Sequence, residues 1–250
     1  MRINETAAKG FSSAADVYER GRPGYAPEAV SWVCERLGIK PGRTVLDLAA
    51  GTGKLTRDLV PSGAAVVAVE PLDEMREHLE RVAPDVQALS GTAEEIPLED
   101  GSVDAVVCAQ AFHWFDPARA LPEIHRVLRT GGGIALLYNS RDLDDSVQKT
   151  LDDLLDPYRG EVARHWVKAH EDVLGKSDLF GPVEERSWTS EQPVSLDGLL
   201  EMAASRSYVA SLDDGPRAEL VARIRAEFAD EPEPIVLRYQ VDVYVADRAG

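Results

Sequence analysis

Apolar residues follow two patterns along the first 140 residues of the chain. Short runs that are apolar almost throughout predict strands, one beginning at Val45 and others at residues 64–69, 86–90, 103–109 and 134–139. Between these runs apolar residues recur at helical spacing, which predicts helices at about residues 27–38, 52–60, 75–82 and 117–128. Strands that are apolar on both faces and alternate with helices favour a parallel sheet covered on both sides. The pattern therefore predicts an α/β protein with a doubly wound sheet.

The segment after residue 140 has a different character. Aspartates are frequent between residues 142 and 156, while Val147, Leu151 and Leu155 keep an apolar stripe, so we expect a helix with a solvated acidic face lying on the core. Further helices are expected at 196–208 and 216–228, and a strand at 183–189. Alternating valines near the end predict a last strand over residues 235–246 that closes the sheet.

Composition narrows the possible partners. The chain has 250 residues, with 44 Asp and Glu against 27 Lys and Arg and a formal net charge of −17, so attraction to nucleic acid or to anionic membranes is disfavoured. We find no apolar signal segment and no run approaching the ~20 apolar residues of a membrane span, and we expect a cytoplasmic protein. Cys34 and Cys108 lack metal-ligand spacing and are expected to be buried thiols. His165 and His170 do not share one helical face, so no metal site is expected.

A glycine-rich turn follows the first predicted strand. Gly51 and Gly53 have no Cβ to keep a ligand away, and the next helix offers unpaired N–H groups, so we expect a small-molecule site there. A dinucleotide-binding turn needs a third glycine where this chain has Thr56, and Glu70 suits the ribose of either NAD or an adenosyl ligand. Asp47 would repel a pyrophosphate but attract a cation. These residues together favour S-adenosylmethionine, which carries an ammonium, a sulfonium and a ribose diol.

The motifs resemble those of class I S-adenosylmethionine-dependent methyltransferases. The matching segments are residues 47–53 as the first motif, Glu70 at the end of the second strand, residues 92–94, residues 110–115 and residues 126–132. The flanks are similar to the trans-aconitate-methyltransferase-like small-molecule branch. This resemblance implies a seven-stranded Rossmann-like sheet in the order 3-2-1-4-5-7-6, with the last strand antiparallel and a helical cap.

The resemblance also implies a set of cofactor-binding residues. Ala93 would bond the adenine through its backbone, Thr92 stands where an aspartate is more usual, and Gln110 would help to hold the methionine moiety. Ala49 replaces the family's first glycine, from which we expect that this position needs no positive φ. The complete cofactor set is Asp47, Ala49, Gly51, Gly53, Glu70, Pro71, Met75, Thr92, Ala93, Glu94 and Gln110.

The same resemblance implies a division of the chain into segments with different roles. Residues 1–250 are expected to form a single methyltransferase domain. Its parts are an N-terminal helical arm at 1–38, a cofactor-binding core at 44–140, a helical cap and substrate region with one returning strand at 141–234, and the last strand at 235–247. Acceptor-side residues are expected to be Tyr18, Arg22, Tyr25, His113, Trp114, Arg206 and Tyr208.

The expected reaction is methyl transfer to a small-molecule acceptor, with a carboxylate or hydroxyl oxygen favoured. His113 is the candidate catalytic base, since its pKa lies near neutrality, and it would be needed only for a hydroxyl or a weakly acidic carbon. Alternatively, His113 and Trp114 stack beside the cofactor or shape the pocket. Residues 110–113 lack the Asn/Asp-Pro-Pro-aromatic pattern of amino-methylating enzymes, which disfavours nucleic-acid bases. The alternative function is a catalytically silent cofactor-binding protein with a regulatory or assembly role.

Overall fold

One mixed sheet organises the computed structural model, which describes residues 23–159 and 173–250. Its seven strands lie in the order β3-β2-β1-β4-β5-β7-β6. Strands β1 to β5 pair in parallel, and β7 runs antiparallel to both β5 and β6. The predicted strand order and the antiparallel last strand are therefore confirmed. The strands are β1 Thr44–Leu48, β2 Ala65–Val69, β3 Gln87–Leu89, β4 Val103–Ala109, β5 Leu128–Arg141, β6 Glu184–Val194 and β7 Ile235–Asp247.

Both faces of the parallel part are covered by helices. Alternation along β1 sends Leu46 into a cluster with Ile124, whereas its neighbour Val45 packs in a second cluster with Val33 and Leu59. Strands buried on both faces explain why their sequences are continuously apolar. The covering helices are α3 Pro27–Arg36, α4 Lys54–Leu59, α5 Asp73–Val82 and α6 Pro117–Val127.

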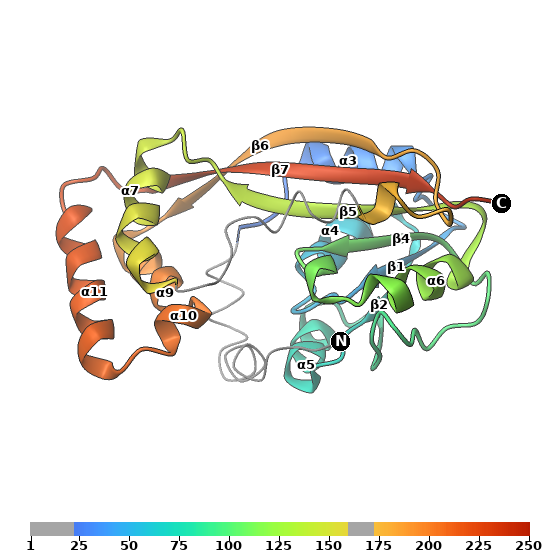
Figure 1. Cartoon of the computed structure of the whole chain (residues 1–250), viewed down its shortest axis with the longest axis horizontal. Helices are drawn as coiled ribbons and strands as arrows, with labels where there is room; N and C mark the ends of the chain where they lie inside the picture. Colours follow the sequence, from blue (N-terminus) through green and yellow to red (C-terminus); the bar gives the residue numbers. More distant parts are fainter. Residues whose placement is uncertain (1–22, 160–172) are drawn as a thin grey trace.

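A third apolar cluster joins the remaining helices to the start of β7. Leu151, Leu199 and Ile224 pack there against Leu237 and Tyr239. Figure 1 shows these helices gathered at the end of the molecule toward which β5 runs. They are α7 Ser146–Leu155, α9 Leu196–Ala204, α10 Ser207–Ala210 and α11 Asp214–Glu227, called here the cap helices. In the described part of the chain, none of the helices is long and apolar enough to cross a membrane.

The acidic helix differs from its prediction in two respects. It packs in the cap cluster through Leu151 and Leu155 rather than on the sheet core. Asp152, expected on a solvated face, is 6% exposed and forms ion pairs with Arg141 and Arg159. The prediction of a solvated face is therefore wrong for this residue, because local spacing does not reveal cationic partners outside the helix.

Gly132 and Gly133, which precede the strand predicted at residues 134–139, lie inside β5. A Cβ on Gly132 would lie 2.5 Å from the carbonyl oxygen of Asp104, and one on Gly133 would lie 2.7 Å from that of Ala246. Neighbouring backbone therefore approaches too closely for a side chain at either position. The helix predicted over residues 196–208 is also divided, into α9 and α10.

Candidate active site

The turn between β1 and α4 is built on left-handed backbone. Gly51 has φ 59° and Gly53 has φ 83°. A Cβ on Gly53 would lie 2.9 Å from Cγ of Leu79 in α5, and the N–H of Gly53 donates to the carbonyl of Ala50 over 3.0 Å. Glycine is thus required at Gly53 both by backbone conformation and by the packing of α5. The turn presents its backbone at the carboxyl edge of the sheet, where ligands bind in doubly wound folds.

Ala49 corrects one prediction. Its φ is 59°, so the position does need left-handed backbone although the residue is alanine. An L-residue in this region carries a conformational cost of roughly 1–2 kcal/mol. Gln110, at the end of the neighbouring strand β4, is the other non-glycine residue with positive φ in the described chain, at 55°. Strained backbone therefore flanks the edge of the sheet at two adjacent strands, a feature that clusters at functional sites.

Asp47 lies beneath the turn rather than on its surface. It is 1% exposed, and its carboxylate accepts a hydrogen bond from Oγ1 of Thr56 over 2.6 Å. Burial raises the pKa of Asp47 to about 7, the hydroxyl of Thr56 opposes that rise, and the charges of Glu70 and Asp58 add to it. Thr56 therefore does more than replace the third glycine of a dinucleotide turn: its hydroxyl holds the buried acid.

Glu70 ties the end of β2 to the glycine turn. Its carboxylate accepts hydrogen bonds from the N–H of Gly51 and the N–H of Leu72, both over 2.9 Å, and the residue is 5% exposed. Burial raises the pKa of Glu70, while these two backbone donors and Arg76 oppose the rise. Each carboxylate oxygen has a second lone pair, so the group can accept further donors such as a diol.

Two residues predicted with Glu70 lie close to the same turn. Met75, in the first half of α5, places its sulfur 3.8 Å from the position that a Cβ on Gly51 would take. Pro71 follows Glu70 directly and is half-buried. Arg76, which the sequence did not single out, donates to the backbone carbonyl of Glu70 over 3.0 Å. The structure therefore brings Gly51, Glu70 and Met75 together.

Residues 92–94 lie in the first half of the loop between β3 and β4. Thr92 and Glu95 form an isolated antiparallel bridge, with N···O distances of 3.4 and 3.2 Å. Ala93 is 2% exposed and packs in the core cluster with Leu48. Glu94 is buried, and its Oε1 accepts from the N–H of Asp116 over 2.9 Å. The loop is therefore attached to the segment just before α6.

The end of β4 carries the aromatic cluster. Gln110 donates through Nε2 to the carbonyl of Asn139 over 3.0 Å, and Asn139 donates through Nδ2 to the carbonyl of Gly24 over 3.0 Å. His113 and Trp114 lie in a short 3-10 helix, with ring centroids 4.7 Å apart, and both are half-buried. The carboxyl end of β4 is thus linked to β5 and to the segment preceding α3.

The predicted acceptor-side residues lie on separate parts of the chain. Tyr18 and Arg22 lie outside the described residues. Tyr25 lines an open hollow of about 780 Å³ between the start of α3 and β6. Arg206 and Tyr208 are half-buried among the cap helices, where Tyr208 interacts with the guanidinium of Arg159.

Within residues 23–159 and 173–250, no group of three or more His, Cys, Asp or Glu side chains could hold a metal ion.

Comparison with known proteins decides the family. Residues 46–136 match the family model of a methyltransferase domain. A protein described as an uncharacterized methyltransferase of Mycobacterium tuberculosis is 42% identical over 228 residues, which cover 89% of this chain and 86% of the relative. The chain belongs to the methyltransferase family. Its sheet order makes it a class I S-adenosylmethionine-dependent methyltransferase, as the motifs predicted.

Other relatives of this methyltransferase extend the match. An uncharacterized methyltransferase of Schizosaccharomyces pombe is 36% identical over 196 residues, covering 78% of this chain and 77% of the relative. A solved structure from Anaeromyxobacter dehalogenans, assigned as a type II methyltransferase, has a TM-score of 0.66 and 27% identity over 91% of this chain and 97% of that one. The likeness therefore includes the region of the cap helices as well as the sheet.

Proposed function

We propose that this methyltransferase moves the methyl group of S-adenosylmethionine to an oxygen atom of a small molecule, with a carboxylate or a hydroxyl as acceptor. The observation that carries the proposal is the hydrogen bond from Gly51 to Glu70, which joins the glycine turn of β1 to the acid of β2. It places an open backbone cradle beside a buried carboxylate with unused lone pairs. That combination suits an adenosyl ligand, whose amino-acid end and ribose diol are covalently joined.

The residues present fit such a cofactor. The turn of Gly51 and Gly53 would receive the amino-acid end, Glu70 would accept from the ribose hydroxyls, and the backbone at Ala93 would meet the base. Met75 would pack beside the ribose, and Gln110 would face the methionine moiety. When bound, the cofactor supplies a methyl group already activated on a sulfonium, so the protein must mainly align the acceptor and exclude water.

The buried acid beneath the turn favours binding of a cationic ligand over binding of a dinucleotide. Asp47 is buried there with a pKa of about 7, raised by loss of solvent. A cation above the turn favours the ionised form of this acid, whereas a pyrophosphate opposes it. Thr56 also favours the ionised form of Asp47, since its hydroxyl donates to the carboxylate over 2.6 Å.

The proposed acceptor site lies around the residues at the end of β4. His113 and Trp114 lie next to Gln110 in sequence and form one wall of the proposed acceptor site. Arg206 and Tyr208 of the cap would orient an anionic acceptor, in keeping with the resemblance to the trans-aconitate-methyltransferase-like branch. The acidic net charge of −17 favours such a small molecule over nucleic acid as the substrate. In this proposal, residues 44–140 hold the cofactor and residues 141–234 cover the acceptor.

Binding calorimetry tests the cofactor. We expect S-adenosylmethionine and S-adenosylhomocysteine to bind and NAD not to bind. Binding of NAD without any response to S-adenosylmethionine would overturn the proposal.

Transfer of a labelled methyl group to a panel of small carboxylic acids and phenols tests the acceptor. Turnover on such an acid or phenol is the expected result. Cofactor binding without turnover on any acceptor class supports the alternative of a silent regulatory or assembly protein. Turnover confined to amines or nucleic acid contradicts the oxygen acceptor.

A further inference from the structure

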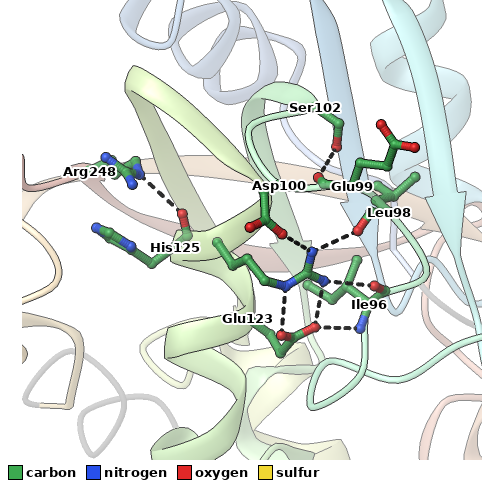
Figure 2. Close-up of polar contacts among 9 residues, drawn as sticks. Ile96, Leu98, Glu99, Asp100, Ser102, Glu123, His125 and Arg248 are labelled. Carbon is green, nitrogen blue, oxygen red and sulfur yellow. Dashed lines mark hydrogen bonds and ion pairs between the residues drawn. The ribbon is translucent and has the colours of Figure 1, made fainter.

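One arginine of α6 has all three nitrogen atoms of its guanidinium group hydrogen-bonded. Nε and Nη2 of Arg126 donate to the two carboxylate oxygens of Glu123, each over 2.8 Å. Nη2 also donates to the carbonyl of Ile96 over 3.0 Å, and Nη1 donates to the carbonyl of Leu98 and to Oδ1 of Asp100, each over 2.8 Å. Figure 2 shows these partners converging from the loop and from the helix.

Glu123, the acidic partner of this ion pair, also binds the backbone of Ile96. Its Oε2 accepts from the N–H of Ile96 over 3.0 Å, in addition to its bond with Arg126. Ile96 is therefore held at both its N–H and its carbonyl by one arginine–glutamate pair. The hydrogen bonds from Arg126 are the largest cause that lowers the pKa of Glu123, so the carboxylate is ionised at neutral pH.

The loop held in this way is the one that contains residues 92–94, between β3 and β4. Arg126 binds the carbonyls on both sides of Pro97, and a Cβ on Gly91 would lie only 2.6 Å from Cδ of Pro97. The start of the loop thus packs against the part that Arg126 fixes. Ile96 adds to this attachment, because its side chain is buried in the core cluster with Ile124 of α6.

We propose that Arg126 and Glu123 are positioning residues that set the backbone of residues 92–96 for recognition of the adenine base. The inference rests on the proposed cofactor. Base recognition through backbone groups needs those groups held within about half an ångström, which a loop achieves only with rigid support. Lysine cannot supply that support at position 126, since its single ammonium lacks the planar, divergent donors of the guanidinium.

Arg129 provides a matched control three positions along the chain. It also pairs with an acid, donating through Nη1 to Oδ2 of Asp104 over 2.6 Å and through Nε to the carbonyl of Gly101 over 3.1 Å. Both of those partners lie after residue 98. Arg129→Lys therefore weakens a comparable ion pair without removing a hydrogen bond to residues 92–98.

The test compares binding of S-adenosylhomocysteine with that of S-inosylhomocysteine, in which hypoxanthine replaces adenine. Wild-type protein is expected to prefer the adenine ligand. Arg126→Lys is expected to raise the Kd for S-adenosylhomocysteine at least tenfold and to cut the preference for adenine at least threefold. Arg129→Lys is expected to leave both quantities within twofold of wild type. If Arg126→Lys does not fold by circular dichroism, Glu123→Gln, which replaces one acceptor oxygen by a donor, takes its place with the same expectation.

Each other outcome has a distinct meaning. Equal loss of affinity for both ligands shows a merely structural role and overturns the inference, as does an unchanged preference in the Arg126 and Glu123 variants. Wild-type binding without any preference for adenine also overturns it, while the proposed cofactor stands. Wild-type protein that binds neither ligand overturns the proposed function itself.

Discussion

The hydroxyl of Thr56 donates to the carboxylate of Asp47 over 2.6 Å, at a place where the acid is 1% exposed. The pair joins the last part of β1 to α4 directly beneath the glycine turn. A hydrogen bond to the ionised carboxylate partly offsets its burial, yet the pKa of Asp47 still rises to about 7. The turn therefore rests on an acid whose charge changes near neutral pH.

This acid makes stability depend on pH. The folded pKa of about 7 lies above the ordinary value of 3.8, so the folded state binds the proton more tightly than the unfolded state does. Without ligand, the free energy of unfolding is expected to fall as the pH rises from about 4 to about 7, by up to about 4 kcal/mol. Asp47→Asn is expected to flatten that dependence, as measured by urea unfolding across the pH range. Asp85→Asn, at an exposed acid that is not among the charges acting on Asp47, serves as the control, and an equal slope in wild type and Asp47→Asn contradicts the prediction.

Glu70 is expected to contribute directly to cofactor affinity. Its carboxylate already accepts from Gly51 and Leu72, and the ribose hydroxyls would add two charge-assisted bonds. Glu70→Ala should weaken S-adenosylhomocysteine binding by roughly 1–3 kcal/mol, the range for a lost hydrogen bond to a charged group. Calorimetry measures the change, with the exposed Glu74→Ala in the same helix region as control. An unchanged affinity in folded Glu70→Ala shows that the ribose is held elsewhere.

Ala49 offers a test of backbone strain at the turn. Its φ of 59° favours glycine, but glycine also gains conformational entropy when the chain unfolds. These effects oppose each other, so Ala49→Gly is expected to change the free energy of unfolding by less than about 0.5 kcal/mol. Ala49→Val places a β-branched residue in left-handed backbone and should cost more than about 1 kcal/mol. Denaturant unfolding of both variants checks the order, and equal stability of the two contradicts the strain.

Substitution of His113 distinguishes two possible acceptors, because a hydroxyl needs a base and a carboxylate does not. For a phenol or other hydroxyl, His113→Gln is expected to lower kcat about 10²- to 10⁴-fold and to remove a titration from the pH profile. For a carboxylate acceptor, which is already ionised, the same change should leave kcat within a few-fold. Trp114→Phe is the control for pocket shape, since it changes the ring that lies 4.7 Å from His113 without removing a proton acceptor. A loss of kcat with both classes of acceptor contradicts the role as base.

Local periodicity predicted the parallel core well, because burial on both faces leaves a direct trace in the sequence. The run at 103–109 coincides with β4, and the run at 64–69 differs from β2 by one residue at its start. Gly132 is not part of the strand predicted at residues 134–139, because glycine adds nothing to the apolar pattern. Its place in β5 depends on the carbonyl of Asp104 in another strand, which no local pattern reveals.

Sequence motifs grouped Gly51 with Glu70 in one candidate site, and the structure places the two residues in contact. Contacts between residues that are distant in sequence and share no motif were less predictable. The contacts of Arg126 with Ile96 and Leu98 span 30 and 28 positions, and its segment was noted only as part of a resemblance. The reverse error occurred at Ala49, where residue type suggested ordinary backbone and the turn imposes positive φ.

Substitution of Asp152 tests how the cap helices are attached to the sheet. It is buried at 6% exposure and forms ion pairs with both Arg141, at the end of β5, and Arg159. Removing the acid leaves two guanidinium groups close together without their shared counter-charge. Asp152→Ala is therefore expected to lower the free energy of unfolding by about 3–5 kcal/mol, the range for breaking a buried pair from one side.

The next residue supplies the control for this prediction. Asp153 pairs with Lys149 on the exposed side of α7, where its side chain is 66% exposed, so Asp153→Ala should cost less than about 1 kcal/mol. Denaturant unfolding of the two variants gives the comparison. Because Arg141 belongs to the sheet and Asp152 to the cap, loss of the pair should also expose α7 selectively to hydrogen exchange. Equal stability of Asp152→Ala and Asp153→Ala would show that the buried acid does not fasten the cap to β5.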